Sequence, residues 1–454
     1  MTTLTASSNG IINNDNAATD ETTYKSEHAD KATMVKAVVA GSVGTVIEWY
    51  DYALYGTAAG LVINNLFFPS LSSAAALLAA FATFAVGYFA RPLGGIIISH
   101  IGDHFGRKPA LIFAIVLMGA TTTLLGLLPS YFTIGIWAPI ILVLLRLFQG
   151  FGAGAELAGA LTFVAEYVPY RRRALCTAII NASTVIGIMF ATGAFFIVSQ
   201  LPEESFMSWG WRVPFLCSAI LFAIALYIRE RLDETPVYAE AMAEAKAKAE
   251  KQKVPLLEVL KHSPKQVVFN MLALCGHSAN SYILSVFIIS YMVNTLGYSR
   301  SDALSALMWA SFFAIIGTPL MGMIADKIGN AKVYIIGNLF IAAFSIPMFL
   351  LVDTMSLPMA ALGMSIMYSI GYGCTSGAQG AFQVNLFPVR YRYSGIALSR
   401  ELNSVLISGP TPFIAAWLVE LGGGTSHYVM GYYIICCLVS VVAVAAIAKY
   451  ANHH

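Results

Sequence analysis

Long apolar runs recur along the whole chain, and they constrain its fold more than any other feature of the sequence. Each run has 18 or more predominantly apolar residues, enough for a helix to cross about 30 Å of hydrocarbon. Hydrophobic residues make up 58% of the 454 residues and charged residues 11%, more apolar side chain than a water-soluble core could bury. The chain is therefore expected to be an all-α integral membrane protein. Twelve transmembrane helices are predicted, at 36–63, 74–99, 109–128, 136–166, 174–199, 213–229, 266–293, 302–324, 333–352, 356–386, 395–419 and 428–449.

The lysines and arginines predict how these helices are oriented. Of 26 such residues, Arg212 and Arg300 lie in loops at one membrane face and Arg91, Arg146 and Arg400 lie inside spans, while the remaining 21 lie in the tails or at the opposite face. The positive-inside rule therefore places both termini in the cytoplasm. Residues 1–35 lack the apolar core of a signal peptide and are expected to be a disordered cytoplasmic tail, and 450–454 a short one.

Several classes of function are disfavoured by the composition and the motifs. A net charge of +2 is too small to suggest a nucleic-acid partner. The six cysteines fall in apolar spans without metal-ligand spacing and are interpreted as small buried hydrophobes. The stretch GFGAG at 150–154 follows no strand, so close helix packing explains it better than a dinucleotide site. No metal, cofactor or enzymatic activity is predicted.

The chain divides into two halves of six spans. Residues 230–265 form the long polar interruption, predicted to be a cytoplasmic linker between a bundle at 36–229 and a second at 266–449. The halves echo each other, because GDHFGRK at 102–108 follows the second span and ADKIGNAK at 325–332 follows the eighth. Such a duplication predicts two pseudo-symmetric six-helix bundles with a site between them near the bilayer midplane.

Several motifs in register identify a resemblance. GDHFGRK and RLFQGFGAGAE at 146–156 resemble the loop and fourth-helix signatures of the major facilitator superfamily. More narrowly, the sequence is similar to the metabolite:proton symporter branch, which includes bacterial shikimate and α-ketoglutarate permeases. The motifs that carry this similarity are EWYDYALYG at 48–56, FARPLGG at 89–95, TIGIWAP at 133–139, SWGWRVPF at 208–215 and LDETP at 232–236.

The first span contains two acids that a lipid-facing helix would not tolerate. A charge at the bilayer centre costs roughly 2.5–3.5 kcal/mol, so it normally faces a partner or a wet cavity. Glu48 and Asp51 are three residues apart, which predicts one polar helix face extended by Tyr52 and Tyr55. Two like charges close together raise one another's affinity for a proton. The pair is therefore a candidate for proton coupling, or alternatively an ion-pair partner of Arg146 or Arg91, or a gate.

The fourth-helix signature supplies further candidates. Arg146 opens it, Gln149 follows one turn later, and Glu156 lies nearly three turns on. The resemblance implies proton coupling for Arg146 and Glu156 and ligand contact for Gln149, although Glu156 could instead cap a packing network. The branch has Gly-Gly-Glu and an aromatic residue here, whereas this chain reads Gly154-Ala155-Glu156-Leu157.

Other polar residues within spans are candidates for substrate binding. Arg91 could contact a ligand, snorkel to the cytoplasmic surface or bind Asp103. Amides and rings on apolar helices suit either polar ligand recognition or interhelical hydrogen bonding. The remaining candidates are His277, Asn280, Tyr282, Gln379, Gln383 and Asn403.

Arg400 and Glu401 depart from the branch, where an aromatic residue and an amide are expected. An arginine can fork two hydrogen bonds to a carboxylate, so an Arg400 facing the cavity predicts an anionic substrate. That inference lapses if Glu401 neutralises Arg400 or if Arg400 lies at the cytoplasmic interface.

The resemblance implies that the loop after the second span is a conformational latch. The glycines of GDHFGRK permit a tight turn, and its charged residues can pair with helix ends across the boundary between the halves. The predicted latch residues are Gly102, Asp103, Gly106, Arg107 and Lys108, with Asp326 in the weaker second copy.

Together these features predict an inner-membrane secondary transporter of bacterial type. It is expected to bring a small organic anion and protons into the cell by alternating access, without a cofactor and as a monomer in the lipid bilayer. Import of zwitterionic osmolytes such as proline or betaine is the main alternative, and drug export is another. A membrane enzyme or a receptor has no motif in its favour.

Overall fold

The computed structural model describes residues 31–105, 107–153, 161, 164, 168–231, 255–388 and 392–450. Within these ranges each of the twelve predicted spans is helical over most of its described residues, and no strand occurs. Eight helical segments are long and apolar enough to cross a membrane, and two shorter apolar helices lie at Ile112–Leu127 and Trp137–Gly152. The two other predicted spans, at 36–63 and 356–386, are helical as well.

The described part of the first half begins at Lys31. Its elements are α2 (Lys31–Ala58), η1 (Ala59–Ile63), α3 (Asn64–Phe67), α4 (Ser73–Phe105), α5 (Arg107–Leu127), α6 (Tyr131–Ile134), α7 (Trp137–Gly152), η2 (Tyr170–Arg172), α9 (Arg173–Val198), α10 (Glu203–Ser205), η3 (Phe206–Gly210) and α11 (Arg212–Arg231). The elements named α2, η1 and α3 form one continuous helical segment, the first span.

The second half is more often interrupted. Its elements are α13 (Pro255–His262), α14 (Pro264–Ala273), α15 (Cys275–Tyr282), η4 (Ile283–Phe287), α16 (Ile288–Ser290), η5 (Tyr291–Thr295), α17 (Arg300–Ile328), α18 (Asn330–Val352), α19 (Leu357–Ile366), η6 (Met367–Tyr372), α20 (Gly373–Leu386), α21 (Arg392–Asn403), η8 (Ser404–Ser408), α22 (Thr411–Leu421) and α23 (His427–Ile447). The segments η4, η5, η6 and η8 are π-helical turns within spans, a distortion frequent at functional sites.

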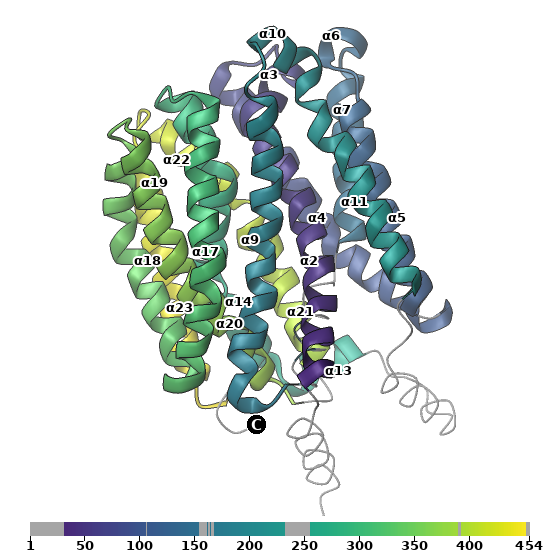
Figure 1. Ribbon diagram of the computed structural model, residues 1–454, viewed down its shortest axis with the longest axis vertical. Coiled ribbons are helices and arrows are strands. Elements are labelled where there is room, and N and C mark those ends of the chain that lie inside the picture. The colour runs from purple at the N-terminus through teal and green to yellow at the C-terminus, as the bar shows by residue number, and fades with distance from the viewer. Residues whose placement is uncertain are drawn as a thin grey trace, which may run out of the picture.

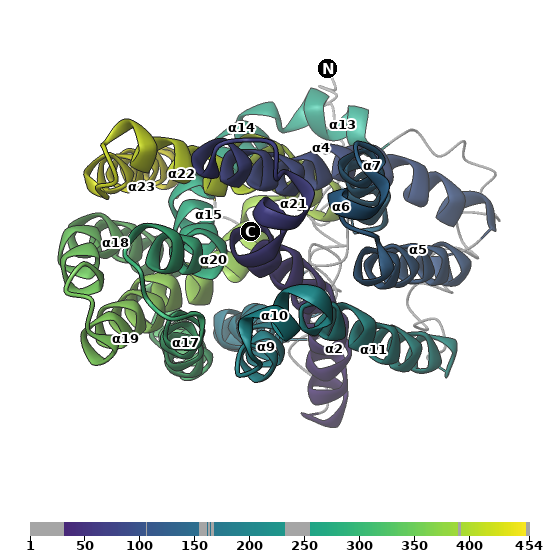
Figure 2. The same ribbon diagram turned by 90° about the horizontal axis from the view of Figure 1, so that it is seen from above.

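The two halves lie side by side, each as a bundle of helices (Figure 2). In Figure 1 helices α17, α18, α19, α22 and α23 of the second half stand to the left, and α4, α5, α7 and α11 of the first half stand to the right. Helix α9 lies beside α17 where the halves meet. Helix α13 and the start of α2 lie at the lower end, the α13 end, whereas α3, α6 and α10 lie at the upper end, the α10 end. Successive spans therefore alternate in direction.

Apolar side chains cover the outside of the molecule as well as filling it. Phe89, Trp137, Ile220, Trp309 and Val442 are each more than half exposed. A water-soluble surface rarely carries so many large apolar groups, which suits contact with lipid. Five of the six cysteines are buried as predicted, but Cys217 is exposed on α11 because it belongs to this outer surface.

Close packing of α4 against α7 confirms the packing interpretation of the glycine-rich stretch. A Cβ atom on Gly150 would overlap the carbonyl of Gly87, so only glycine allows the two backbones to approach here. A Cβ atom on Gly87 would also lie 2.7 Å from Nη2 of Arg146. These glycines therefore make room for a buried arginine as well as for a helix crossing.

Candidate functional site

A cavity of about 50 Å³ lies between the two halves, with room for more than one water molecule. Most of its lining residues are polar, and they come mainly from α2 and α4 of the first half and from α15, α21 and η8 of the second. The lining residues are Glu48, Trp49, Arg91, Leu274, His277, Ser278, Ser281, Tyr282, Ala397, Arg400, Glu401, Asn403, Ser404 and Ser408. Six of the predicted site residues are among them.

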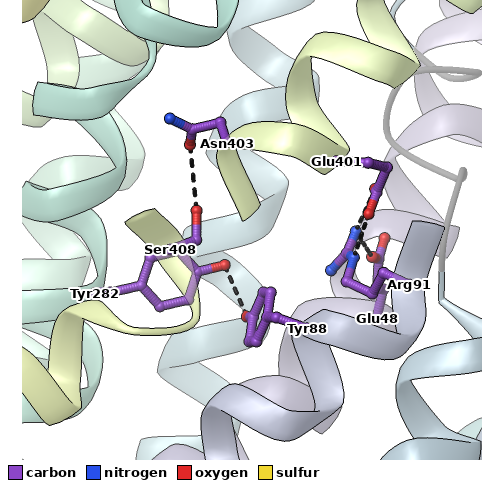
Figure 3. A network of polar contacts seen from close by, with 7 residues as sticks. All are labelled: Glu48, Tyr88, Arg91, Tyr282, Glu401, Asn403 and Ser408. Atoms are coloured by element: carbon purple, nitrogen blue, oxygen red, sulfur yellow. Dashed lines mark hydrogen bonds and ion pairs between the residues drawn. The ribbon is translucent and has the colours of Figure 1, made fainter. Parts of the chain in front are cut away.

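Arg91 is the electrostatic centre of this wall (Figure 3). Its Nε donates to Oε2 of Glu401 at 3.2 Å and its Nη2 to Oε1 of the same residue at 3.3 Å, a bidentate pair. The same Nη2 contacts Oε1 of Glu48 at 3.4 Å. Arg91 therefore does not snorkel to the membrane surface, because two carboxylates hold it at the cavity, one from each half.

Aromatic rings close the cavity on the side of the α10 end. The guanidinium of Arg91 lies 5.2 Å from the ring centre of Tyr52 and 5.4 Å from that of Tyr88. The Tyr88 hydroxyl donates to the Tyr282 hydroxyl at 2.8 Å and so joins the halves (Figure 3). Trp49 packs on Tyr282 with ring centres 5.8 Å apart. Arg91 follows Tyr88 by three residues on α4, so the ion pairs lie about one turn nearer the α13 end.

A second polar network lies inside the first half. Asp51 is fully buried and accepts hydrogen bonds from the Thr122 hydroxyl and from Nε2 of Gln149. The amide oxygen of Gln149 accepts in turn from Arg146. Asp51 and Arg146 are therefore linked through Gln149 rather than by a direct ion pair.

Arg146 is held by the first half alone. It donates to the carbonyls of Phe84 at 3.0 Å and of Thr83 at 3.4 Å, and its guanidinium lies 4.0 Å from the ring centre of Tyr55. The Tyr55 hydroxyl shares a 2.6 Å hydrogen bond with Thr83. All of these side chains are buried, so Arg146 reaches the cavity only through its neighbours.

The single polar face predicted for the first span is in fact two. Glu48 and Tyr52 lie on Arg91 at the cavity, whereas Asp51 and Tyr55 belong to the Arg146 network. The reason is geometric: residues four apart differ by about 40° around a helix and residues three apart by about 60°. Glu48 therefore points in nearly the same direction as Tyr52, toward the cavity. Asp51 points in nearly the same direction as Tyr55, toward the interior of the first bundle.

The second half contributes a different part of the wall. Nη1 of Arg400 lies 3.4 Å from Oε1 of Gln383, while Glu401 pairs with Arg91. Arg400 therefore faces the cavity, as one of the predicted alternatives required. The ring of His277 also lines the cavity, and its Nδ1 lies 3.0 Å from the Thr375 hydroxyl.

Asn403 lines the cavity too, but its amide already has partners. Its oxygen accepts from Ser278 at 2.6 Å and from Ser408 at 3.4 Å, and its nitrogen donates to the Met271 carbonyl at 3.0 Å. Asn280 and Gln379 lie inside the second half, where they contact Tyr433 and Tyr334 respectively. Gln383 contacts Asn270 at 3.4 Å and touches the cavity only through Arg400.

Among the predicted latch residues, Asp326 has a clear partner across the halves. Its two carboxylate oxygens accept from the backbone N–H groups of Ala174 at 2.9 Å and Leu175 at 3.0 Å. These are unsatisfied donors at the start of α9, so Asp326 caps that helix. Gly102 lies within the last turns of α4 (Ser73–Phe105), so the prediction that it forms part of a tight turn is wrong.

Some predicted residues fall where the structure gives no contacts. Glu156 and Gly106 lie outside the described residues, as do most of the predicted 230–265 linker and the terminal tails. The backbones of Asp103, Arg107 and Lys108 belong to α4 and α5, and their side chains are outside the description.

The α10 end is closed by direct contact between the halves. Nδ2 of Asn294 donates to the carbonyl of Gly60 at 2.8 Å, and a Cβ atom on Gly60 would lie 2.8 Å from Cβ of Ser290. Arg300 forms an ion pair with Glu203 at the surface of the same end. These contacts hold the two halves against each other at the α10 end.

Sequence reasoning did not select several residues of the site. The sequence predicts Glu401 only as a neutraliser of Arg400, and Tyr88, Thr122 and the cavity serines are not among the predicted site residues. Ser278 and Ser281 are three residues apart in the predicted seventh span, a spacing that does indicate one polar helix face. The partnership of Glu401 with Arg91 has no local signal, because 310 residues separate the two.

A twelve-helix membrane protein with a polar cavity between two similar bundles has the architecture of a secondary transporter. The sequence matches the Major Facilitator Superfamily over residues 41–408 and 271–453. The chain belongs to this superfamily and, by its relatives, to the metabolite:proton symporter branch. It is thus a transporter and not an enzyme.

The relatives are similar over nearly their whole length. The shikimate transporter of Escherichia coli is 35% identical over 407 residues, covering 89% of this chain and 92% of the relative. The inner membrane metabolite transport protein YhjE of the same organism is 37% identical, covering 87% and 90%. The proline/betaine transporter of Salmonella typhimurium is 33% identical, covering 86% and 79%.

Solved structures share the fold at lower identity. A partially occluded inward-open xylose transporter from E. coli has a TM-score of 0.70 at 18% identity, covering 92% of this chain and 98% of that one. A D-xylose-proton symporter has a TM-score of 0.68 at 19% identity, covering 93% and 98%.

Proposed function

We propose that this protein is a proton-coupled symporter that imports a small organic acid across a bacterial inner membrane. The observation that carries the proposal is the cavity wall, where Arg91 and Arg400 lie beside Glu48 and Glu401 between the two halves. Arginines bind carboxylates with bidentate geometry, and carboxylates can accept the co-transported proton. The similarity to a shikimate transporter supports the same class of substrate.

The proposed site combines a charged and an uncharged part. Arg91 and Arg400 would bind the carboxylate of the substrate. Hydroxyls and rings from Ser278, His277 and Tyr282 would meet its remaining polar groups. Because the cavity is only about 50 Å³, the halves must move apart before an organic acid can enter.

The proposed coupling uses the buried acids. Glu48 at the cavity and Asp51 in the Arg146 network are the candidate proton carriers, and Glu156 remains a candidate from the resemblance. Protonation weakens the hold of an acid on its arginine partner, which allows the halves to rock. The Asp326 cap on α9 would be part of the latch that holds the α13 end closed.

The proposed topology places the α13 end in the cytoplasm, with both termini and a 230–265 linker on that side. The excess of lysine and arginine at this side supports the assignment. A monomer suffices for the mechanism, because the cavity lies within one chain. No ATP site is needed, since each elementary charge that crosses a membrane potential of 100 mV releases about 2.3 kcal/mol to drive transport.

Proton uptake into proteoliposomes tests this function directly. The purified full chain is reconstituted with an internal pH dye and exposed to shikimate, α-ketoglutarate, C4-dicarboxylates, citrate, aromatic acids, proline and betaine. Internal acidification by an acid supports the proposal. Acidification by proline or betaine alone would replace it with the osmolyte importer, which the 33% identical proline/betaine transporter favours. No response to any of them would contradict the proposal and favour drug efflux.

A further inference from the structure

The charges on the cavity wall balance one another. Arg91 and Arg400 supply two positive charges, and Glu48 and Glu401 supply two negative ones. With His277 counted as neutral, the wall has no net charge to offer an anion. A monocarboxylate therefore gains a net attraction only after one of the two glutamates has taken up a proton.

Glu401 is the glutamate whose position fits this task. It occupies both Nε and Nη2 of Arg91 with its two oxygens, at 3.2 and 3.3 Å. A substrate carboxylate has the same planar geometry and would need the same two donors. Glu401 and such a substrate are thus mutually exclusive on this face of Arg91.

Glu401 also differs from Glu48 in the half from which it comes. Glu48 and Arg91 both belong to the first half and would move together, whereas Glu401 lies on α21 of the second half. The Arg91 to Glu401 pair must break whenever α4 and α21 separate. Breaking a largely buried pair leaves two unpaired charges, which is strongly unfavourable unless one is neutralised or replaced.

We infer that Glu401 is the proton-operated guard of Arg91: a protonated Glu401 releases the guanidinium to the carboxylate of a monocarboxylate substrate, and one proton crosses with each monoanion. This inference rests on the proposed symport function. It names both the carrier of the proton and the charge class of the substrate.

Several other charged and titratable groups lie on the helices around Glu401. Arg91 pairs with it from α4, and Tyr52 and Tyr88 lie against the guanidinium of Arg91. The same cavity is lined by Glu48 from α2, by His277 and Tyr282 from α15, and by Arg400 from α21. On α13 and α14, Lys261, His262 and Lys265 are exposed at the α13 end. Glu48 is the nearest competitor for the proton, so it must be tested beside Glu401.

The stoichiometry of one proton per monoanion determines how transport responds to membrane potential. A monoanion that crosses with one proton moves no net charge, so a pH difference should drive uptake and an electrical potential should not. Accumulation of shikimate should reach about tenfold per pH unit. If one net charge moved per cycle, a potential of 100 mV would instead change accumulation about fifty-fold.

The test uses the full chain in proteoliposomes with radiolabelled shikimate as the probe. Uphill accumulation under a pH gradient is compared with counterflow at equal pH, for wild type, Glu401→Gln, Glu401→Asp and Glu48→Gln. The matched control is Glu420→Gln, the same change at an exposed acid of α22. Glu401→Gln should keep its counterflow rate within about threefold of wild type but lose uphill accumulation, and its KM for shikimate should not depend on pH. Glu401→Asp and Glu420→Gln should still accumulate shikimate.

The outcomes distinguish a failure of the proposed symport function from a failure of the role assigned to Glu401. Wild type that takes up neither shikimate nor any other acid of the panel would overturn the proposed function. If Glu401→Gln accumulates shikimate as wild type does, or if only Glu48→Gln loses accumulation, the role of Glu401 is overturned and the proposed function stands. Loss of counterflow in a folded Glu401→Gln would do the same, because Glu401 would then be needed for binding. If that variant is not produced, a fifty-fold response of wild type to potential overturns the inference.

Discussion

The carboxylate of Asp326 accepts a 3.0 Å hydrogen bond from the backbone N–H of Leu175, so the last turn of α17 caps the first turn of α9 in the other half. An N-terminal cap contributes about 0.5–2 kcal/mol to helix stability. Because this cap comes from the other half, the same energy stabilises the arrangement in which α9 and α17 are in contact. The cap therefore links helix stability to the conformational equilibrium of the transporter.

Removal of this cap should loosen the α13 end. Asp326→Ala deletes both acceptors of the cap. The loss of its free energy should raise the equilibrium population of states with α9 and α17 separated by roughly 2–30-fold. The measurement is the rate at which a cysteine introduced at Ala178, buried beside Gly322 of α17, reacts with a maleimide. Asp302→Ala, at the opposite end of the same helix, is the control. An equal rate in both variants would contradict the latch.

Replacement of Arg146 by lysine should destabilise the first half while keeping its charge. Lysine cannot reproduce the planar fork that reaches Gln149 and the carbonyls of Phe84 and Thr83. Leaving these groups without a donor should cost about 1–3 kcal/mol, seen as earlier thermal unfolding in detergent. Arg300→Lys at the surface ion pair should cost less than about 1 kcal/mol. Identical unfolding curves for the two variants would show that the network is not structural.

A side chain at Gly60 should prevent closure of the α10 end. Gly60→Val places atoms where Ser290 lies, and overpacking of this kind costs typically 1–3 kcal/mol in the closed state. Transport should fall about tenfold or more, and a cysteine introduced near Asn294 should become more reactive. Gly431→Val is the matched control, because a Cβ atom there meets no atom within 4 Å. Wild-type transport by Gly60→Val would refute the contact as a gate.

Loss of the Arg400 guanidinium should weaken substrate binding more than turnover. A hydrogen bond to a charged group contributes about 1.5–3 kcal/mol, so Arg400→Gln should raise the KM for shikimate about 10–100-fold in counterflow. The maximal exchange rate should change little, since Arg400 pairs with Gln383 and not with the Arg91 to Glu401 bridge. Arg300→Gln, outside the cavity, should leave the KM unchanged. An unchanged KM in Arg400→Gln would remove it from the substrate site.

The number and position of the helices could be read from the sequence because they depend on local properties. A run such as 174–199 needs only its own length and hydropathy to predict a crossing helix, and α9 (Arg173–Val198) agrees with it closely. The buried charges were equally visible, since a carboxylate in an apolar helix requires a partner wherever it lies. Residues such as Glu48, Arg91 and Arg400 were therefore found without coordinates.

The partner of each charge was decided by the tertiary structure. Glu48 and Asp51 lie three residues apart, yet one meets Arg91 at the cavity and the other meets Thr122 and Gln149 inside the first bundle. Arg91 and Glu401 lie 310 residues apart and form a bidentate pair. Helix periodicity gives the direction of a side chain relative to its own axis, whereas the packing of bundle against bundle determines what lies in that direction. That is why the sequence showed which charges lie within the spans, whereas only the fold assigned their pairings.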